Sequence, residues 1–100
     1  MNASVEEIAG KYIATLDGEL DTAAASEVEE ILKPLYSAPN PDIVIDCSRL
    51  QYIASSGLRI LLSILKSAKA NGGKVVLRNV NEDIKSVFKM TGFVNIFDFE

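Results

Sequence analysis

Residues 11–18 alternate between the two sides of an extended chain, with Tyr12, Ala14 and Leu16 on the same side. A period of two residues predicts a β-strand. The ten residues before it carry a weaker pattern that fits a short strand, turning back into the next one near Gly10. The chain therefore begins with two neighbouring strands.

A second apolar pattern is continuous rather than alternating. Ile43, Val44 and Ile45 follow one another within residues 42–47, which predicts a strand that is buried on both faces. Strands of this kind belong to parallel or mixed sheets that are covered by helices. Residues 74–80, with an apolar centre, predict a further strand.

Three other segments place apolar residues at helical spacing. The predicted helices span residues 23–35, about 56–71 and 82–91. Asp21 or Thr22 is placed to cap the first helix, and Asn81 to cap the third. Pro34 marks the last turn of the first helix or a kink in it. The remaining residues 93–99 predict a final short strand or an extended tail.

Strands that alternate with helices through short loops predict the α/β class. We expect one domain over residues 1–100, with a mixed, mostly parallel β-sheet and helices packed on it. Right-handed crossovers bring the strand-to-helix loops to the same edge of the sheet, which places residues 17–22, 48–57 and 80–83 on one rim. We expect the functional surface at this rim and on the helix that begins near Ser56.

The helix over residues 56–71 has apolar residues outside its main stripe. The stripe that we expect to face the core consists of Leu58, Leu61, Leu62, Leu65 and Ala68. At about 100° per residue, Ile60 points almost opposite to this stripe and Ile64 lies on its flank. We predict that these two side chains form an exposed apolar patch for a partner. In the alternative, one of the chain's own terminal segments covers them.

Charge and hydropathy narrow the class of partner. The net charge is −4 and the lysines and arginines are scattered, which argues against nucleic-acid binding. A protein partner or a small ligand is favoured instead. The apolar runs are too short to span a bilayer, and the N-terminus has no signal-peptide pattern. We expect a cytoplasmic protein that does not insert into membranes.

Several kinds of chemistry are excluded by composition. Cys47 is the only cysteine and the chain has no histidine, so neither an internal disulfide, a histidine-ligated zinc site nor a Ser-His-Asp triad can form. Cys47 ends an apolar strand and is expected to be a small core side chain. An enzyme would need Ser55 with Lys74 or Lys85 as a base, but the Gly-x-Ser-x-Gly pattern of hydrolases is missing. We expect no enzymatic activity and no cofactor.

The polar segment before the second predicted helix ends in Ala54, Ser55, Ser56 and Gly57. It delivers two hydroxyls and a glycine to a helix N-terminus, where free N–H groups and the helix dipole favour a negative charge. These serines fit two interpretations. One hydroxyl caps the helix in the ordinary way, or one serine is switched between a neutral and a phosphorylated state.

Residues 46–58, with the sequence DCSRLQYIASSGL, resemble the phosphorylation loop of STAS domains, and specifically of bacterial anti-sigma-factor antagonists. Residues 16–21, with the sequence LDGELD, resemble a second hallmark of that family. The resemblance implies a STAS-like fold. It also implies phosphorylation of Ser55, or alternatively of Ser56, by an anti-sigma factor that is a serine kinase and supplies ATP and Mg²⁺.

The resemblance further implies a regulatory cycle. The unphosphorylated protein binds the anti-sigma factor and frees a sigma factor, phosphorylation ends this binding, and a serine phosphatase restores it. The residues expected to contact the partner are Asp21, Ala54, Ser55, Ser56, Gly57, Leu58, Ile60 and Ile64.

Three of these residues carry a specific expectation. Ala54 stands where sporulation-type antagonists often have an aspartate, so the chain departs from their Asp-Ser-Ser-Gly pattern. Gly57, having no side chain, would let the kinase approach the serine closely. Asp21 either caps a helix or organises the phosphorylation loop.

The alternative function is a STAS module without a switch. Such a module would bind a protein or a small ligand constitutively, as part of a transporter accessory or a signalling complex. It would bind its partner equally well with alanine or aspartate in place of Ser55, whereas a switch would fail with aspartate.

Overall fold

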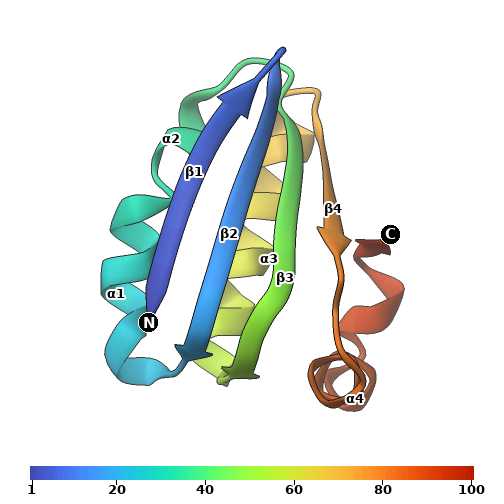
Figure 1. Ribbon diagram of the computed structural model, residues 1–100. Coiled ribbons are helices and arrows are strands. Elements are labelled where there is room, and N and C mark those ends of the chain that lie inside the picture. Colours follow the sequence, from blue (N-terminus) through green and yellow to red (C-terminus); the bar gives the residue numbers. More distant parts are fainter.

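The computed structural model describes residues 1–100 and has a five-stranded sheet at its centre (Figure 1). The strands lie in chain order: β1 (Asn2–Ile8), β2 (Lys11–Leu20), β3 (Asp42–Ile53), β4 (Lys74–Arg78) and β5 (Asp98–Phe99). β1 pairs with β2 in the antiparallel direction, and all other neighbours are parallel. The predicted α/β class and the mixed, mostly parallel sheet are confirmed.

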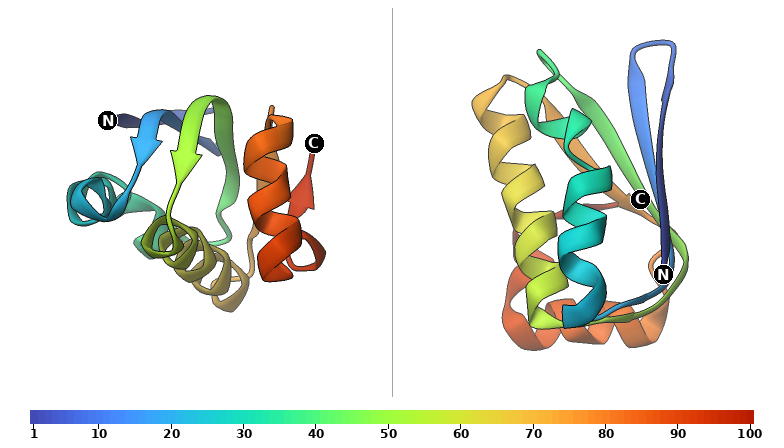
Figure 2. Two further views of the ribbon diagram at one scale, coloured as in Figure 1. Left: turned by 90° about the horizontal axis from the view of Figure 1, so that it is seen from below. Right: turned by 90° about the vertical axis from the view of Figure 1, so that its left-hand side faces the viewer.

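Four α-helices accompany the sheet: α1 (Thr22–Ile31), α2 (Pro34–Ser37), α3 (Ser55–Ala70) and α4 (Glu82–Thr91). α1, α2 and α3 lie together on one face of the sheet, and α4 lies across one end of it beside β4 (Figures 1 and 2). A short 3₁₀ turn, η1 (Phe93–Asn95), connects α4 to β5. The predicted tail is thus one 3₁₀ turn followed by a two-residue strand.

The first two strands form a tight hairpin. Ile8 pairs with Lys11 across Ala9 and Gly10, which have φ angles of 52° and 82°. Two successive residues with positive φ give a turn whose twist matches that of the strands. The predicted turn near Gly10 is confirmed, and the weakly patterned first strand is seven residues long.

Pro34 neither kinks the first predicted helix nor lies in its last turn. α1 ends at Ile31, and Pro34 is the first residue of the separate helix α2. Proline fits this position because the first N–H groups of a helix have no intrahelical acceptor to lose.

The predicted loop over residues 48–53 is wrong, because β3 continues to Ile53. Gly18 pairs with Leu50 after one register shift, and Leu20 pairs with Ile53 after a second. Leu50 and Ile53 are buried, whereas the polar residues between them face solvent. The polarity that indicated a loop belongs to the exposed side of a twisted two-stranded extension, and only Ala54 separates β3 from α3.

Helices cover only one face of the sheet. Val44, on the opposite face, is nevertheless only 3% exposed. Its register partners are Ile13 on β2 and Val76 on β4, and side chains paired across strands shield one another. The continuous run of apolar residues therefore has two causes, helix packing for Ile43 and Ile45 and lateral shielding for Val44.

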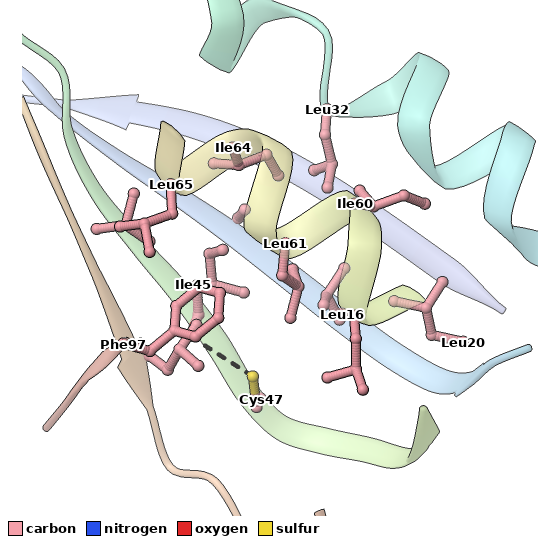
Figure 3. Packing of buried hydrophobic residues seen from close by; sticks show 14 of the residues in the cluster. Leu16, Leu20, Leu32, Ile45, Cys47, Ile60, Leu61, Ile64, Leu65 and Phe97 are labelled. Atoms are coloured by element: carbon pink, nitrogen blue, oxygen red, sulfur yellow. Dashed lines mark hydrogen bonds between the residues drawn. The ribbon is translucent and has the colours of Figure 1, made fainter. Parts of the chain in front are cut away.

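The prediction that Ile60 and Ile64 form an exposed patch is wrong. Both are buried, with 4% and 1% of their surface exposed. α1 and α2 pack beside α3 on the same face of the sheet, so the flank of α3 is covered as well as its inner side. Leu32, at the end of α1, points toward these two residues (Figure 3). The cover comes from α1 and α2, not from a terminal segment.

We expect Ile64→Ala to lower the free energy of unfolding by about 2–5 kcal/mol, because it leaves a cavity in a packed core. Met90→Ala is the control, since Met90 is 84% exposed and a surface change costs about 0.5 kcal/mol or less. Urea unfolding of both variants measures the difference. Equal stabilities would contradict the burial of Ile64.

Candidate functional site

The strand-to-helix connections meet at one edge of the sheet, at the bottom in Figure 1. The backbone N–H of Ala54 donates to the carbonyl oxygen of Leu20 over 2.9 Å. The hydroxyl of Ser56 lies 3.3 Å from that of Thr22. Two of the predicted rim segments, far apart in the chain, are thus joined by hydrogen bonds.

The third segment joins the rim through Asn81. Its side-chain oxygen accepts from the N–H of Ile84 over 2.9 Å, which caps α4 as predicted. Its side-chain nitrogen donates to the carbonyl oxygen of Leu50 over 3.2 Å. One side chain therefore fixes the start of α4 against the extension of β3.

Ser55 is the first residue of α3, and Ala54 occupies the cap position without a side-chain hydrogen bond. The helical ladder begins with the N–H of Leu58, which donates to the oxygen of Ala54 over 3.0 Å. The N–H groups of Ser55, Ser56 and Gly57 consequently have no intrahelical acceptor. Neither serine is the residue at the cap position, so the capping interpretation of these serines is wrong.

The two serines differ in accessibility. Ser55 is exposed, whereas Ser56 is half-buried and hydrogen-bonded to Thr22. Ser55 is therefore the hydroxyl that another protein reaches most easily.

Asp21 acts as a helix cap. Its carboxylate accepts from the N–H of Ala24 over 2.9 Å and so begins α1. The residue also precedes Thr22, the hydrogen-bonding partner of Ser56. A cap at this position holds the start of α1 close to the start of α3.

Gly57 is buried and faces the ends of β2 and β3 rather than solvent. A Cβ atom at this position would lie 2.7 Å from Leu20 and 2.9 Å from Ile53. The expectation that Gly57 opens the site to a kinase is therefore wrong, because the glycine makes room for packing inside the protein. Leu58 is also buried, with 3% of its surface exposed, so its side chain is not available to a partner.

Two exposed residues within four positions of Ser55 did not stand out in the sequence. Tyr52 is 49% exposed and lies on the extension of β3. Arg59 lies on α3 and lines a shallow groove of about 270 Å³ together with Ser56 and with Glu29 of α1. The spacing of four residues between Ser55 and Arg59 is the signal that identifies Arg59 from sequence.

The thiol of Cys47 lies inside the core, 3.7 Å from the carbonyl oxygen of Ile45 (Figure 3). Burial, and secondly the charge of Asp46, raise the pKa of this thiol to about 12. Cys47 is a core side chain, as predicted.

The lysines considered as bases do not serve Ser55. Lys74 begins β4, at the end of the sheet opposite the rim. The ammonium of Lys85 lies over the ring of Phe99, 5.3 Å from its centre.

The structure has no cluster of three or more acidic, histidine or cysteine side chains that could hold a metal ion. None of the helices combines the length and hydropathy needed to cross a membrane.

Comparison with known proteins gives a consistent result. The sequence profile of the STAS domain matches residues 2–100. BtrV, a proposed anti-sigma factor antagonist of Bordetella bronchiseptica, is 33% identical over 97% of this chain and 84% of its own length. The anti-sigma-B factor antagonist of Staphylococcus epidermidis is 29% identical over 96% of this chain and 91% of its own length.

The fold is also found among solved structures. The anti-sigma factor antagonist SpoIIAA in its unphosphorylated form superposes with a TM-score of 0.81 at 22% identity, covering 99% of this chain and 88% of that one. SpoIIAA of Bacillus in its phosphorylated form superposes with a TM-score of 0.75 at 22% identity, covering 99% of this chain and 91% of that one.

We expect Gly57→Ala to destabilise the protein by about 1–2 kcal/mol. The added methyl group overpacks the contact with Leu20 and Ile53, and this outweighs the better helix propensity of alanine, which is about 1 kcal/mol. Thermal unfolding measures the change, with Ser63→Ala at an exposed site of α3 as the control. A stabilised Gly57→Ala variant would contradict the packing role.

We expect the thiol of Cys47 to react with a maleimide at pH 8 about 1,000-fold more slowly in the native protein than in urea, because only the thiolate reacts. The raised pKa also has a consequence for stability. Above about pH 9 the unfolded chain loses the thiol proton first, so stability falls as the pH rises toward 12. Rapid native labelling would contradict the buried position.

Proposed function

The chain belongs to the STAS-domain family of anti-sigma factor antagonists, and on this premise we propose that it works by partner switching controlled at Ser55. The unphosphorylated protein binds an anti-sigma factor and thereby frees a sigma factor. Phosphorylation of Ser55 ends the binding. Antagonists of this family are non-enzymatic regulators, so the kinase activity belongs to the partner.

The observation that carries this proposal is the position of Ser55. Its hydroxyl is exposed at the first residue of α3, where a kinase can reach it without unfolding the rim. The adjacent free N–H groups and the positive end of the helix dipole tolerate a phosphate in the folded state. SpoIIAA, which shares the fold, has been solved in a phosphorylated form.

The chemistry of the switch needs a kinase with ATP and Mg²⁺. The Oγ atom of Ser55 forms a bond to the γ-phosphorus of ATP as the bond between that phosphorus and the β,γ-bridging oxygen breaks. The hydroxyl proton passes to a base on the kinase, and ADP leaves. A serine phosphatase returns the hydroxyl by transferring the phosphoryl group to water.

Phosphorylation changes the surface more than the fold. It adds a charge of about −1.5 to −2 and three acceptor oxygens at one exposed point. A partner surface that closes over the neutral hydroxyl would have to desolvate or repel this charge. Partner affinity therefore falls while the domain remains folded.

In this proposal the contact surface is the rim around Ser55 and not the buried flank of α3. Exposed or half-buried residues are available there: Asp21, Tyr52, Ala54, Ser56 and Arg59. Tyrosine and arginine are enriched among the residues that dominate protein interfaces. The exchange of partners takes place in the cytoplasm, where ATP is available to the kinase.

We expect Ser55→Glu to weaken binding to the anti-sigma factor by about tenfold or more, corresponding to about 1.4 kcal/mol, whereas Ser55→Ala binds like the parent. Ser37→Glu adds the same charge at an exposed residue of α2, and it should bind normally. Calorimetric titration of the parent, these three variants and Ser56→Glu with the purified partner measures the affinities.

Two results would require a change of the proposal. Equal affinities of Ser55→Glu and Ser55→Ala would indicate a constitutive interaction module. A loss confined to Ser56→Glu would keep the switch but move it to the neighbouring serine.

A further inference from the structure

We propose that Arg59 is the intramolecular partner of the phosphate on Ser55, and that its guanidinium holds the phosphoserine against α3. This inference rests on the proposed phosphorylation of Ser55. It assigns a function to a side chain outside the matched motif and specifies the charge that a partner meets in each state.

The spacing along α3 brings the two side chains together. Arg59 follows Ser55 by four residues and Ser56 by three, and residues so spaced lie next to each other on a helix, with Cβ atoms about 5–6 Å apart. Ser55 and Arg59 are both exposed. A guanidinium and a phosphate at this separation can form two parallel charge-assisted hydrogen bonds.

Arg59 is free to make this contact. The three ion pairs of the protein are Lys33–Glu30, Arg49–Asp17 and Arg78–Asp46. Glu29 lines the same groove as Arg59, yet the two do not form an ion pair. Arg59 is thus the only positively charged residue that lines this groove, and its guanidinium has no ion-pair partner.

Three of the four α-helices, α3 among them, have no acidic residue in the first turn. α4 has Glu82 and Asp83 in its first turn, as the helix dipole favours. The first turn of α3 contains no acidic residue, and the arginine follows in the next turn. No carboxylate in the first turn of α3 therefore competes with a phosphate on Ser55 for the guanidinium of Arg59.

The pairing gives the switch a definite charge reversal. Before phosphorylation the surface beside Ser55 presents one free positive charge. Afterwards the guanidinium is engaged, and the pair carries a net charge of about −0.5 to −1 at the same point. Phosphorylation therefore neutralises a cation on the surface that this protein presents to its partner, and it also adds an anion there.

The test uses full-length protein with phosphoserine incorporated at position 55 during translation, so that it does not depend on a kinase. The parent, Arg59→Gln and Lys66→Gln are each prepared with serine and with phosphoserine. Lys66 is an exposed control on α3, two turns or about 10 Å beyond Arg59 on a similar face. Thermal unfolding gives the gain in Tm on phosphorylation for each pair.

We expect phosphorylation to raise the Tm of the parent and of Lys66→Gln by about 2–5 °C, and to raise that of Arg59→Gln by less than half as much. The Nε–H signal of Arg59 in the NMR spectrum should also move on phosphorylation of the parent. A purely structural role of Arg59 would shift both members of a pair equally. Equal gains in Arg59→Gln and Lys66→Gln, with an unmoved Nε–H signal, would overturn the inference.

Binding of the anti-sigma factor to the same proteins separates this inference from the switch itself. If the phosphorylated parent protein no longer binds the anti-sigma factor but Arg59→Gln does not reduce the gain in Tm, the pairing of Arg59 with the phosphate is refuted and the switch stands. If phosphorylated parent protein binds as tightly as the serine form, the switch fails whatever Arg59 does.

Discussion

The close approach of the first turn of α3 to the ends of β2 and β3 fixes the geometry of the rim. Gly57 lies so near Leu20 and Ile53 that a methyl group would not fit, and the N–H of Ala54 donates to the oxygen of Leu20. With the helix held on its inner side, Ser55 projects outward. The position of the candidate site thus follows from core packing. The hydroxyl of Ser55 needs no hydrogen bond of its own to be held at the surface.

A site built in this way suits a regulator. In the proposed function a single exposed serine of the rim is modified, while nearby residues such as Asp21 and Asn81 cap helices. Adding a phosphate changes charge at one point and leaves the supporting hydrogen bonds in place. In the proposed pairing, Arg59, one helical turn further along α3, holds the modified side chain.

Much of this structure could be predicted from the sequence, because local patterns and global packing agree. The apolar run at Ile43 to Ile45 indicated a buried strand, and Asn81 indicated a cap. Burial of Ile60 and Ile64 could not be predicted, because helical periodicity finds one stripe and does not show that α1 lies against the flank. The extension of β3 to Ile53 was hidden for a similar reason, since its solvent-facing side is polar. The role of Gly57 depends on side chains from two distant strands, which no local pattern contains.

Mass spectrometry of the protein isolated from the cells that produce it tests the central claim most directly. The intact mass, followed by fragmentation, shows whether a phosphate is present and which residue carries it. The account predicts that a fraction of the molecules carries one phosphate on Ser55 and that this fraction changes between growth, starvation and stress. Protein without phosphate under all three conditions would contradict the account.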